Sequence, residues 1–272
     1  MVDRYAGVGD RYAVIGNPVA HSRSPWIHAE FARATGQALR YEAIEAPRGG
    51  FAQAVAAFRA AGGKGLNVTL PFKEEAYALC AEVSERAGLA RAVNTLILGE
   101  KIFGDNTDGA GLLADLEKNL GKKVKGSHVL LLGAGGAAQG VAGALLEAGA
   151  AALVIANRTA GRAAALAARF PGVEGCGYEA LPDMRFDIVV NATSAGLQGA
   201  SPALPAGILG PGVLAYEMVY GRDTPFLAAA RGAGARACDG LGMLVEQAAE
   251  SFYLWRGVRP ATAPVLERLR RG

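Results

Sequence analysis

The feature that most constrains the fold is a glycine-rich string in the middle of the chain, Gly133-Ala-Gly-Gly-Ala-Ala138. It follows an apolar run at residues 129–132, which predicts a buried strand, and it opens an Ala-rich segment that predicts a helix over residues 136–148. This strand, turn and helix are the context of the G-x-G-x-x-G/A fingerprint, whose glycines let the backbone approach a pyrophosphate. A glycine-rich turn without a ligand is the alternative, and the context favours a dinucleotide site.

The rest of the second half repeats the same alternation of strands and helices. Further strands are predicted at residues 152–156, 187–190, 213–216 and near 238, and further helices at 162–170 and 225–231. Such alternation is typical of a parallel, doubly wound sheet of the Rossmann type.

The strand after the fingerprint ends without an acidic residue. An NAD-binding enzyme places Asp or Glu there to bind the ribose 2′-hydroxyl. Here Arg158 and Arg162 follow instead, and two guanidinium groups suit a 2′-phosphate, although solvated surface arginines are the alternative. The sequence therefore predicts NADP (NADPH) as the cofactor. The residues expected to bind it here are Gly133, Ala134, Gly135, Gly136, Ala137, Asn157, Arg158, Thr159 and Arg162.

The first half also reads as alternating strands and helices, with polar clusters where strands end and helices begin. Ser24 and Pro25 predict a helix start with Ser24 as N-cap, and residues 105–108 are expected to cap a helix that reaches residue 120. The clusters are Ser22 with Ser24, Asn67 with Thr69, Lys73, Asn94, and Asp105-Asn-Thr-Asp108. Ligands of open α/β sheets bind at such positions, which makes these side chains candidates for a substrate site.

Composition limits the other classes of function. Hydrophobic residues make up 51% of the 272 residues and charged residues 19%, so the chain is folded rather than disordered. The net charge of +3 is small and its basic residues are scattered, which argues against nucleic-acid binding. Three separated cysteines and three histidines form no disulfide or metal-site pattern. The most apolar stretch, residues 129–156, is interrupted by Gln139 and Glu147, and the first five residues are polar, so a cytoplasmic protein without membrane contact is expected.

The chain is long enough for two α/β domains. We expect a substrate-binding, catalytic domain at residues 1–108 plus 243–272, and an NADP-binding Rossmann domain at residues 109–242. The long helix predicted at residues 243–255 would return to the first domain. The basic segment at residues 121–126 also looks like a junction between domains.

Longer strings identify a family. Between about Tyr12 and Trp255, several strings resemble those of the shikimate dehydrogenase family and follow one another in the family's order. They are GNPVAHSRSPWIH, GGKGLNVTLPFKEEA, AVNTL, GDNTDGAGLL, GAGGAA, NRT, NATS and DGLGMLVEQAA. The resemblance implies NADPH-dependent, reversible reduction of 3-dehydroshikimate to shikimate in aromatic amino acid biosynthesis. It also implies a small-molecule substrate, no nucleic-acid or membrane partner, and a monomer or homodimer.

The resemblance also implies roles for individual residues. Lys73 and Asp108 are similar to the family's catalytic pair, with Lys73 as acid and base. The expected substrate-binding residues are Ser22, Ser24, Asn67, Thr69, Lys73, Asn94, Asp108, Tyr220 and Gln247. Ser22 and Ser24 would bind the carboxylate, with Asn67 and Tyr220 as wall residues. Thr193, Met218 and Gly240 match positions at the nicotinamide end of the cofactor.

Two other functions stay open at this point. One is a quinate/shikimate dehydrogenase with relaxed cofactor use, against which the missing acid beside Arg158 argues. The other is a catalytically inactive NADP-binding sensor, which would be expected to lack Lys73 or Asp108. The segment Tyr216-Glu-Met-Val-Tyr220 departs in detail from the commoner family version, which concerns the shape of the nicotinamide pocket.

Overall fold

The computed structural model describes residues 9–271, so the polar N-terminal segment (residues 1–8) and Gly272 lie outside the described residues. The chain divides into two compact units. Unit 1 is Met1–Thr107 with Val245–Gly272, and unit 2 is Asp108–Leu244. The basic segment at residues 121–126 therefore lies inside unit 2, and the prediction that it joins two domains is wrong. Each unit has its own sheet covered by helices, which confirms the predicted α/β class.

The sheet of unit 1 has the strand order β2-β1-β3-β5-β6-β4. β1 is parallel to β2 and β3, whereas β5 is antiparallel to both β3 and β6. The carboxyl ends of β1, β3 and β6 and the amino end of β5 therefore meet at one edge of the sheet. The bounds are β1 Asp10–Gly16, β2 Leu39–Glu45, β3 Gly63–Val68, β4 Glu82–Val83, β5 Thr95–Leu98 and β6 Ile102–Asp105.

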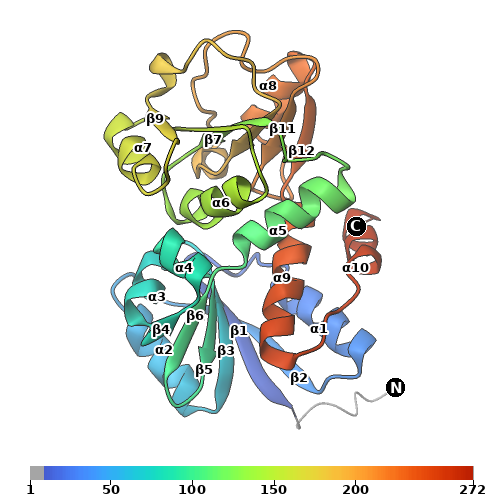
Figure 1. The fold of residues 1–272 in the computed structure, drawn as a ribbon. Coiled ribbons are helices and arrows are strands. Elements are labelled where there is room, and N and C mark those ends of the chain that lie inside the picture. The colour runs from blue at the N-terminus through green and yellow to red at the C-terminus, as the bar shows by residue number, and fades with distance from the viewer. Residues whose placement is uncertain (1–8, 272) are drawn as a thin grey trace. The chain divides into compact units, whose positions relative to one another are not determined.

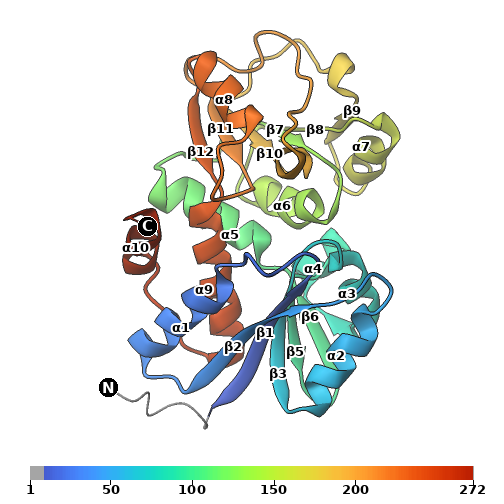
Figure 2. The same ribbon diagram turned by 180° about the vertical axis from the view of Figure 1, so that it is seen from behind.

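Helices cover both faces of this sheet. Figures 1 and 2 show α2 (Phe51–Ala60) and α3 (Lys73–Leu79) on one face, and α1 (Ser24–Thr35) and α9 (Leu241–Arg256) on the other. Along the strands, Ala13, Ile15, Leu66 and Val68 pack with α2 and α3 because successive side chains of a strand point to opposite faces. The short helix α4 (Glu85–Ala90) and the C-terminal helix α10 (Ala263–Arg271) complete unit 1.

The start of α1 differs from the prediction in one respect. The N-cap residue is Arg23, and Ser24 is the first helical residue, so Ser24 is not the N-cap. Instead, the Ser22 hydroxyl accepts a 3.2 Å hydrogen bond from the Ser24 backbone N–H. The helix ends as predicted at Gly36, whose φ of 65° is the left-handed conformation that glycine adopts most easily.

The sheet of unit 2 is parallel throughout, in the order β12-β11-β10-β7-β8-β9. Counted from β7, this is the order 3-2-1-4-5-6 of doubly wound dinucleotide-binding sheets, with the switch point between β7 and β10. The bounds are β7 His128–Leu132, β8 Ala152–Ala156, β9 Glu174–Cys176, β10 Ile188–Asn191, β11 Leu214–Glu217 and β12 Arg236–Asp239. The predicted Rossmann architecture is confirmed.

Helices cover both faces of this second sheet as well (Figure 1). α5 (Asp108–Ala114), α6 (Gly136–Glu147) and α7 (Ala160–Ala167) pack on the face that Val129, Leu131 and Ile155 occupy. α8 (Pro225–Gly232) packs on the other face, against Leu130 and Val154. The helix predicted to reach residue 120 continues beyond α5 as a π-helical turn, Asp115–Asn119. Short 3₁₀ turns at Tyr178–Ala180 and Ala195–Gln198 complete the unit.

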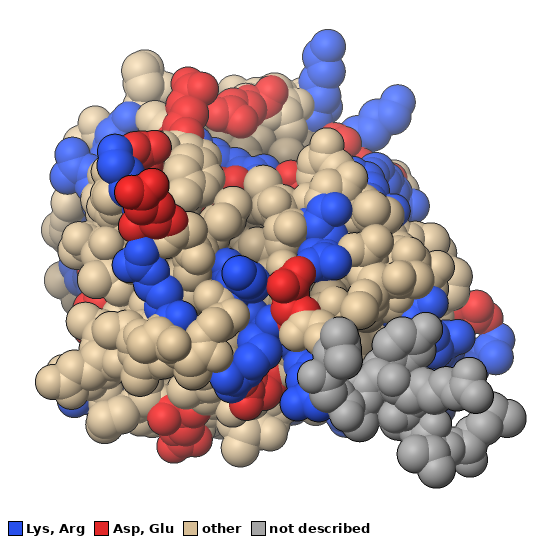
Figure 3. Space-filling model, turned by 90° about the horizontal axis from the view of Figure 1, so that it is seen from below, with Lys and Arg blue, Asp and Glu red and all other residues tan. Residues whose placement is uncertain are grey.

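No helix in the described part of the chain is long and apolar enough to span a membrane. On the one face that Figure 3 shows, Asp and Glu side chains lie among the Lys and Arg side chains.

Candidate active site

The predicted substrate residues of unit 1 gather at the sheet edge where β1 and β3 end. Ser22 and Ser24 follow β1, and Thr69 directly follows β3 beside Gly16, where an added Cβ would lie 2.4 Å from Thr69 Cγ2. Lys73 opens α3, and its carbonyl accepts a 2.9 Å hydrogen bond from the N–H of Val93, the residue before Asn94. The sheet topology therefore brings hydroxyl groups, an amide and an ammonium group to one edge.

Asn94 is held at this edge by a buried hydrogen-bond network. Its Oδ1 accepts from the Thr107 N–H at 2.8 Å and the Thr95 hydroxyl at 2.9 Å. Its Nδ2 donates to the Thr107 hydroxyl at 2.9 Å and to Gln247 Oε1 at 3.4 Å. Asn94 and Gln247, both predicted to bind substrate, are thus brought together, with their amide orientations fixed by neighbours.

Asn67 takes part in the same network and is largely occupied by it. Its Nδ2 lies 2.9 Å from Ser251 Oγ and 3.2 Å from Thr95 Oγ1, and its Oδ1 accepts a 2.7 Å hydrogen bond from the Tyr41 hydroxyl. Ser251 also lies 2.9 Å from Thr95 Oγ1. Asn67 therefore ties β3 to β5 and α9.

Three members of this network were not among the predicted residues: Tyr41, Thr95 and Ser251. Thr107 was predicted only as part of the polar run at residues 105–108. One signal was available for Ser251, which lies four residues after Gln247 and therefore on the same face of α9. Thr107 lies inside the GDNTDG string, but nothing in the string separates a structural hydroxyl from a substrate-binding one.

Asp105 does not cap α5 as expected. Its buried carboxylate accepts from Arg86 Nε at 2.7 Å, Arg86 Nη2 at 2.8 Å and Ser84 Oγ at 2.5 Å. Burial raises the pKa of Asp105, but these hydrogen bonds and the Arg86 charge outweigh burial and hold the pKa below its ordinary value. Arg86 also contacts Glu250 of α9. Asp105 is thus a structural anchor for the segment that leads to Asp108.

His28 lies one turn after Ser24 on α1 and is completely buried. Its ring stacks on Tyr41 at a centroid distance of 4.1 Å. Burial lowers the pKa of His28 to about 3, an effect that Asn67 only partly opposes. The ring is therefore neutral near pH 7 and supports the aromatic packing beneath the edge.

In unit 2, the fingerprint loop has the geometry that its sequence predicts. Gly133 adopts a φ of 112°, and an added Cβ would lie 3.1 Å from Ala192 O, so only glycine fits. Gly135 is the N-cap residue of α6, and an added Cβ there would meet no protein atom within 4 Å. Because Gly135 provides no capping side chain, the N–H groups of the first turn of α6 receive no side-chain cap. Such a cradle fits a pyrophosphate.

The loop after β8 carries the predicted 2′-phosphate residues. Asn157 Nδ2 donates a 3.1 Å hydrogen bond to Thr159 O, which shapes the turn into α7. Arg158 and Arg162 are both exposed, and neither has an ion-pair partner within residues 9–271. Two exposed guanidinium groups therefore follow the strand where an NAD-binding chain carries an acid.

The remaining predicted cofactor residues lie at the same edge of the unit 2 sheet. Thr193 follows β10, Met218 follows β11 and Gly240 follows β12. The Met218 N–H donates a 3.0 Å hydrogen bond to Asn191 O, and a Cβ at Gly240 would lie 2.3 Å from Met218 O. Asp108 lies at the start of α5, and Tyr220 is half-buried in the loop after β11.

Comparison with known proteins agrees with this geometry. A model of the shikimate dehydrogenase substrate binding domain matches residues 14–96, one of shikimate / quinate 5-dehydrogenase matches residues 115–198, and one of the shikimate 5′-dehydrogenase C-terminal domain matches residues 240–270. The chain belongs to the shikimate dehydrogenase family. The first match contains the predicted site residues from Ser22 to Asn94. The second contains the fingerprint, Arg158, Arg162 and Thr193, and the third contains Gly240 and Gln247.

Individual shikimate dehydrogenases are similar over almost the whole chain. The NADP(+) shikimate dehydrogenase of Aromatoleum aromaticum is 59% identical over 96% of this chain and 97% of its own, and that of Dechloromonas aromatica is 56% identical over 97% and 98%. The crystal structure of Thermus thermophilus shikimate 5-dehydrogenase in complex with NADP(H) and shikimate superimposes with a TM-score of 0.86, at 40% identity, covering 96% of this chain and 99% of that chain.

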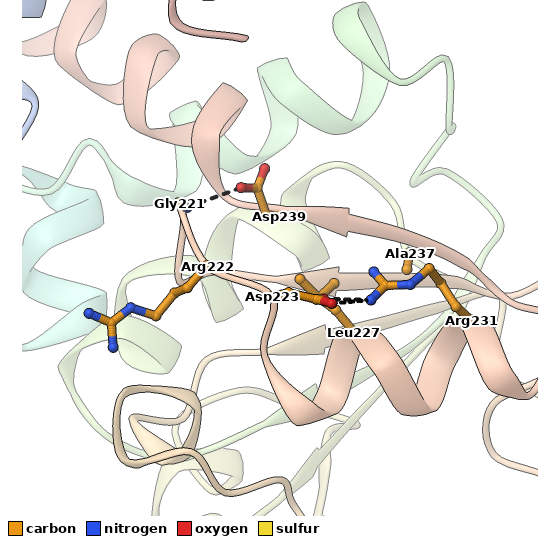
Figure 4. A pocket seen from close by; sticks show the side chains of 7 residues that line it. All are labelled: Gly221, Arg222, Asp223, Leu227, Arg231, Ala237 and Asp239. Atoms are coloured by element: carbon orange, nitrogen blue, oxygen red, sulfur yellow. Dashed lines mark hydrogen bonds and ion pairs between the residues drawn. The ribbon is translucent and has the colours of Figure 1, made fainter. Parts of the chain in front are cut away.

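A separate hollow in unit 2 contains none of the residues predicted from the family. It has a volume of about 480 Å³ and lies beside α8 and β12 (Figure 4). Asp223 pairs with Arg231 at 2.5 Å, Asp239 accepts a 3.2 Å hydrogen bond from the Gly221 N–H, and Arg222 points away from both. Its acidic groups therefore already have partners. No group of three His, Cys, Asp or Glu side chains that could hold a metal is found among the described residues.

Proposed function

We propose that this chain is an NADP-dependent shikimate dehydrogenase that reduces 3-dehydroshikimate reversibly to shikimate, a step of the shikimate pathway to aromatic amino acids. The observation that carries the proposal is the 59% identity to an NADP(+) shikimate dehydrogenase over 96% of the chain. Two features of the structure also support the proposal: the polar sheet edge of unit 1 and the dinucleotide cradle of unit 2. Both lie at the positions where α/β sheets bind ligands.

Unit 1 supplies groups suited to a carboxylated triol. The Ser22 and Ser24 hydroxyls at the start of α1 bind the carboxylate, since a helix N-terminus favours an anion. The proposed ligands of the ring hydroxyls are Thr69, Asn94, Asp108 and Gln247, and the proposed wall residues are Asn67 and Tyr220. The hydrogen bonds that fix Asn94 and Gln247 before substrate arrives reduce the cost of ordering them on binding.

Lys73 is the proposed acid and base. Reduction of a ketone by hydride places negative charge on the carbonyl oxygen, and an ammonium group can stabilise that charge and then donate its proton. In the reverse direction the neutral amine accepts the proton of the substrate hydroxyl. Asp108 is the second proposed catalytic residue, as a carboxylate that orients a substrate hydroxyl.

Unit 2 supplies the proposed cofactor site. When bound, NADPH supplies the hydride. The pyrophosphate lies in the fingerprint loop, formed by Gly133, Ala134, Gly135, Gly136 and Ala137. The nicotinamide end contacts Thr193, Met218 and Gly240. Asn157, Arg158, Thr159 and Arg162 bind the adenosine side, where the two arginines favour a 2′-phosphate over a 2′-hydroxyl.

The finer expectations about partners follow from the same proposal. The partner is a small molecule, neither a nucleic acid nor a membrane, and the chain acts as a monomer or homodimer. The three free cysteines, none of which forms a disulfide in the described residues, suit the reducing cytoplasm.

The test is a panel of substrates and cofactors followed through the near-ultraviolet absorbance of the reduced nicotinamide. We expect reduction with shikimate and NADP⁺, and much slower reduction when NAD⁺ or quinate replaces either one. Comparable rates with quinate or NAD⁺ would favour the relaxed quinate/shikimate enzyme, which the second family match also names. Binding of NADP⁺ without turnover of any substrate would favour the inactive sensor.

A further inference from the structure

Glu217 is a fully buried carboxylate without a cationic partner. It is the last residue of β11, its exposed fraction is 0%, and no Lys or Arg pairs with it among the described residues. Three neutral donors surround it instead. Oε2 accepts from Asn191 Nδ2 at 2.8 Å and from the Thr224 hydroxyl at 3.0 Å, and Oε1 accepts from the Val219 N–H at 3.2 Å. An ionised group is costly to bury, so this arrangement calls for an explanation.

The partners of Glu217 shape three separate loops. Asn191 ends β10, and its Oδ1 accepts from both the N–H and the hydroxyl of Thr193, at 3.1 and 2.7 Å. Val219 directly follows Met218. Thr224 is the N-cap of α8, where its hydroxyl also accepts from the Leu227 N–H. One carboxylate therefore ties together the segments that carry Thr193 and Met218 and the start of α8.

The loop after β10 packs closely on this carboxylate. A Cβ at Gly196 would lie 2.9 Å from Thr224 Cγ2 and 3.3 Å from Glu217 Oε2. Since little space is left, a change in the hydrogen bonding of Glu217 must move this loop or the side chains around it.

The place of these loops in the sheet shows which part of the cofactor they serve. β7, β8 and β9 form one mononucleotide-binding half, and β10, β11 and β12 form the other. Arg158 and Arg162 follow β8, so the adenosine 2′-phosphate belongs to the first half. Glu217, Asn191 and Thr193 belong to the second half, which takes the nicotinamide.

We propose that Glu217 is a positioning residue for the nicotinamide half of the cofactor: its ionised carboxylate holds the Thr193 and Met218 loops in their binding geometry without contacting the cofactor. The inference rests on the proposed function. The ionised form has two acceptor oxygens and no donor, so it can accept from all three neighbours, whereas the protonated form would present an O–H group to one of them.

Protonation of Glu217 should therefore weaken binding. Burial raises the pKa of Glu217, and the negative charge of Asp239 on β12 adds to this, whereas the hydrogen bonds from Val219, Thr224 and Asn191 lower it. The net shift is upward. The carboxylate is ionised above this raised pKa, and the ordered loops are lost as the pH falls through it.

The experiment compares two ligands by calorimetry across a range of pH. NADP⁺ is one, and 2′-phospho-ADP-ribose, which has the same phosphates but no nicotinamide, is the other. Glu217→Gln should lower the affinity for NADP⁺ by about tenfold or more and the affinity for 2′-phospho-ADP-ribose by less than about twofold. Wild type should lose NADP⁺ affinity relative to the fragment as the pH falls, and Glu217→Gln should not. Glu179→Gln, at an exposed glutamate of the same unit, should behave as wild type.

A second variant guards against failure of Glu217→Gln to fold. Thr224→Val removes one hydrogen bond but leaves the charge, and should weaken NADP⁺ by a smaller factor with the same selectivity. Equal weakening of both ligands, or no change in either, would overturn the inference. Absence of NADP⁺ binding by the wild type would instead overturn the proposed function, and this inference with it.

Discussion

The Tyr216 hydroxyl donates a 2.5 Å hydrogen bond to the Asp115 carboxylate inside unit 2, and both side chains are almost fully buried. Asn119 Nδ2 donates to the other carboxylate oxygen at 2.9 Å. Burial, together with the negative charge of Asp115, raises the pKa of Tyr216 well above its ordinary value, so the hydroxyl remains a donor. The pair joins β11 to the π-helical turn after α5.

Tyr216→Phe should destabilise the protein by about 1–3 kcal/mol, because it removes a donor from a buried carboxylate. Urea unfolding followed by circular dichroism measures the change. Tyr253→Phe is the matched control, since the Tyr253 side chain is 42% exposed and should change stability by less than about 0.5 kcal/mol. Equal stability of the two variants would contradict the structural role of the pair.

Gly242→Ala should also destabilise the protein, by about 1–3 kcal/mol. A Cβ at this position would lie 1.9 Å from Asp115 Oδ1, so the carboxylate would have to leave its hydrogen bonds. Gly161→Ala is the control, because an added Cβ meets nothing within 4 Å and the residue lies in α7, where Ala should raise stability by about 0.5–1 kcal/mol. Thermal unfolding of both variants separates steric from conformational effects.

Arg86→Met should change how the stability of the protein depends on pH. In the wild type the lowered pKa of Asp105 contributes stability above the ordinary Asp pKa of about 4, and this contribution is lost as the pH falls through the lowered value. Without Arg86, burial dominates and the pKa rises, so the variant should be less stable by about 1–3 kcal/mol at neutral pH and approach the wild type in acid.

The control for Arg86 is the exposed pair of Lys101 and Glu82, whose side chains are 72% and 60% exposed. Lys101→Met should cost less than about 1 kcal/mol at any pH. A gap between Arg86→Met and wild type that stays constant from neutral to acid pH would show that Asp105 is not the group responsible.

Replacing both Arg158 and Arg162 by Ala should raise the KM for NADP⁺ by about 100-fold or more, since each charge-assisted hydrogen bond to phosphate contributes about 1.5–3 kcal/mol. The KM for NAD⁺ should change little, because NAD⁺ has no 2′-phosphate. Steady-state kinetics with both cofactors measures this, with Arg185→Ala as an exposed control in the same unit. An equal rise in the KM for NADP⁺ and the KM for NAD⁺ would show that the two arginines do not recognise the 2′-phosphate.

Much of unit 2 could be predicted because its signals are local. The apolar strands, the glycine turn at Gly133 and the missing acid before Arg158 all lie close together in the sequence. β9 was missed because Glu174-Gly-Cys176 has no strand pattern; a Cβ at Gly175 would lie 2.5 Å from Ala163 O, which explains the glycine. The helix α10 was missed because its apolar residues are interrupted by one glutamate and three arginines and were taken for a basic terminal run; it is held by buried Val265 and Leu266 and by Arg268 over Trp26.

The network around Asn67 could not be predicted for a different reason. Its hydrogen bond to Ser251 joins residues 184 positions apart, and only the packed fold brings them together. The same holds for the Arg86 guanidinium, which donates to both Asp105 and Glu250, because isolated charges far apart in the sequence give no sign that they meet. Ser24 was taken for an N-cap because Ser-Pro favours that position, but here the Ser22 hydroxyl accepts the first free N–H.

The most direct test of the central claim is the rate of NADP⁺ reduction by shikimate in the wild type and in Lys73→Ala. We predict clear turnover by the wild type, and a kcat lower by about 10²–10⁴-fold in the variant with NADP⁺ affinity unchanged, as expected for loss of a general acid and base. A variant that retains the wild-type kcat, or a wild type that binds NADP⁺ but does not oxidise shikimate, would contradict the account.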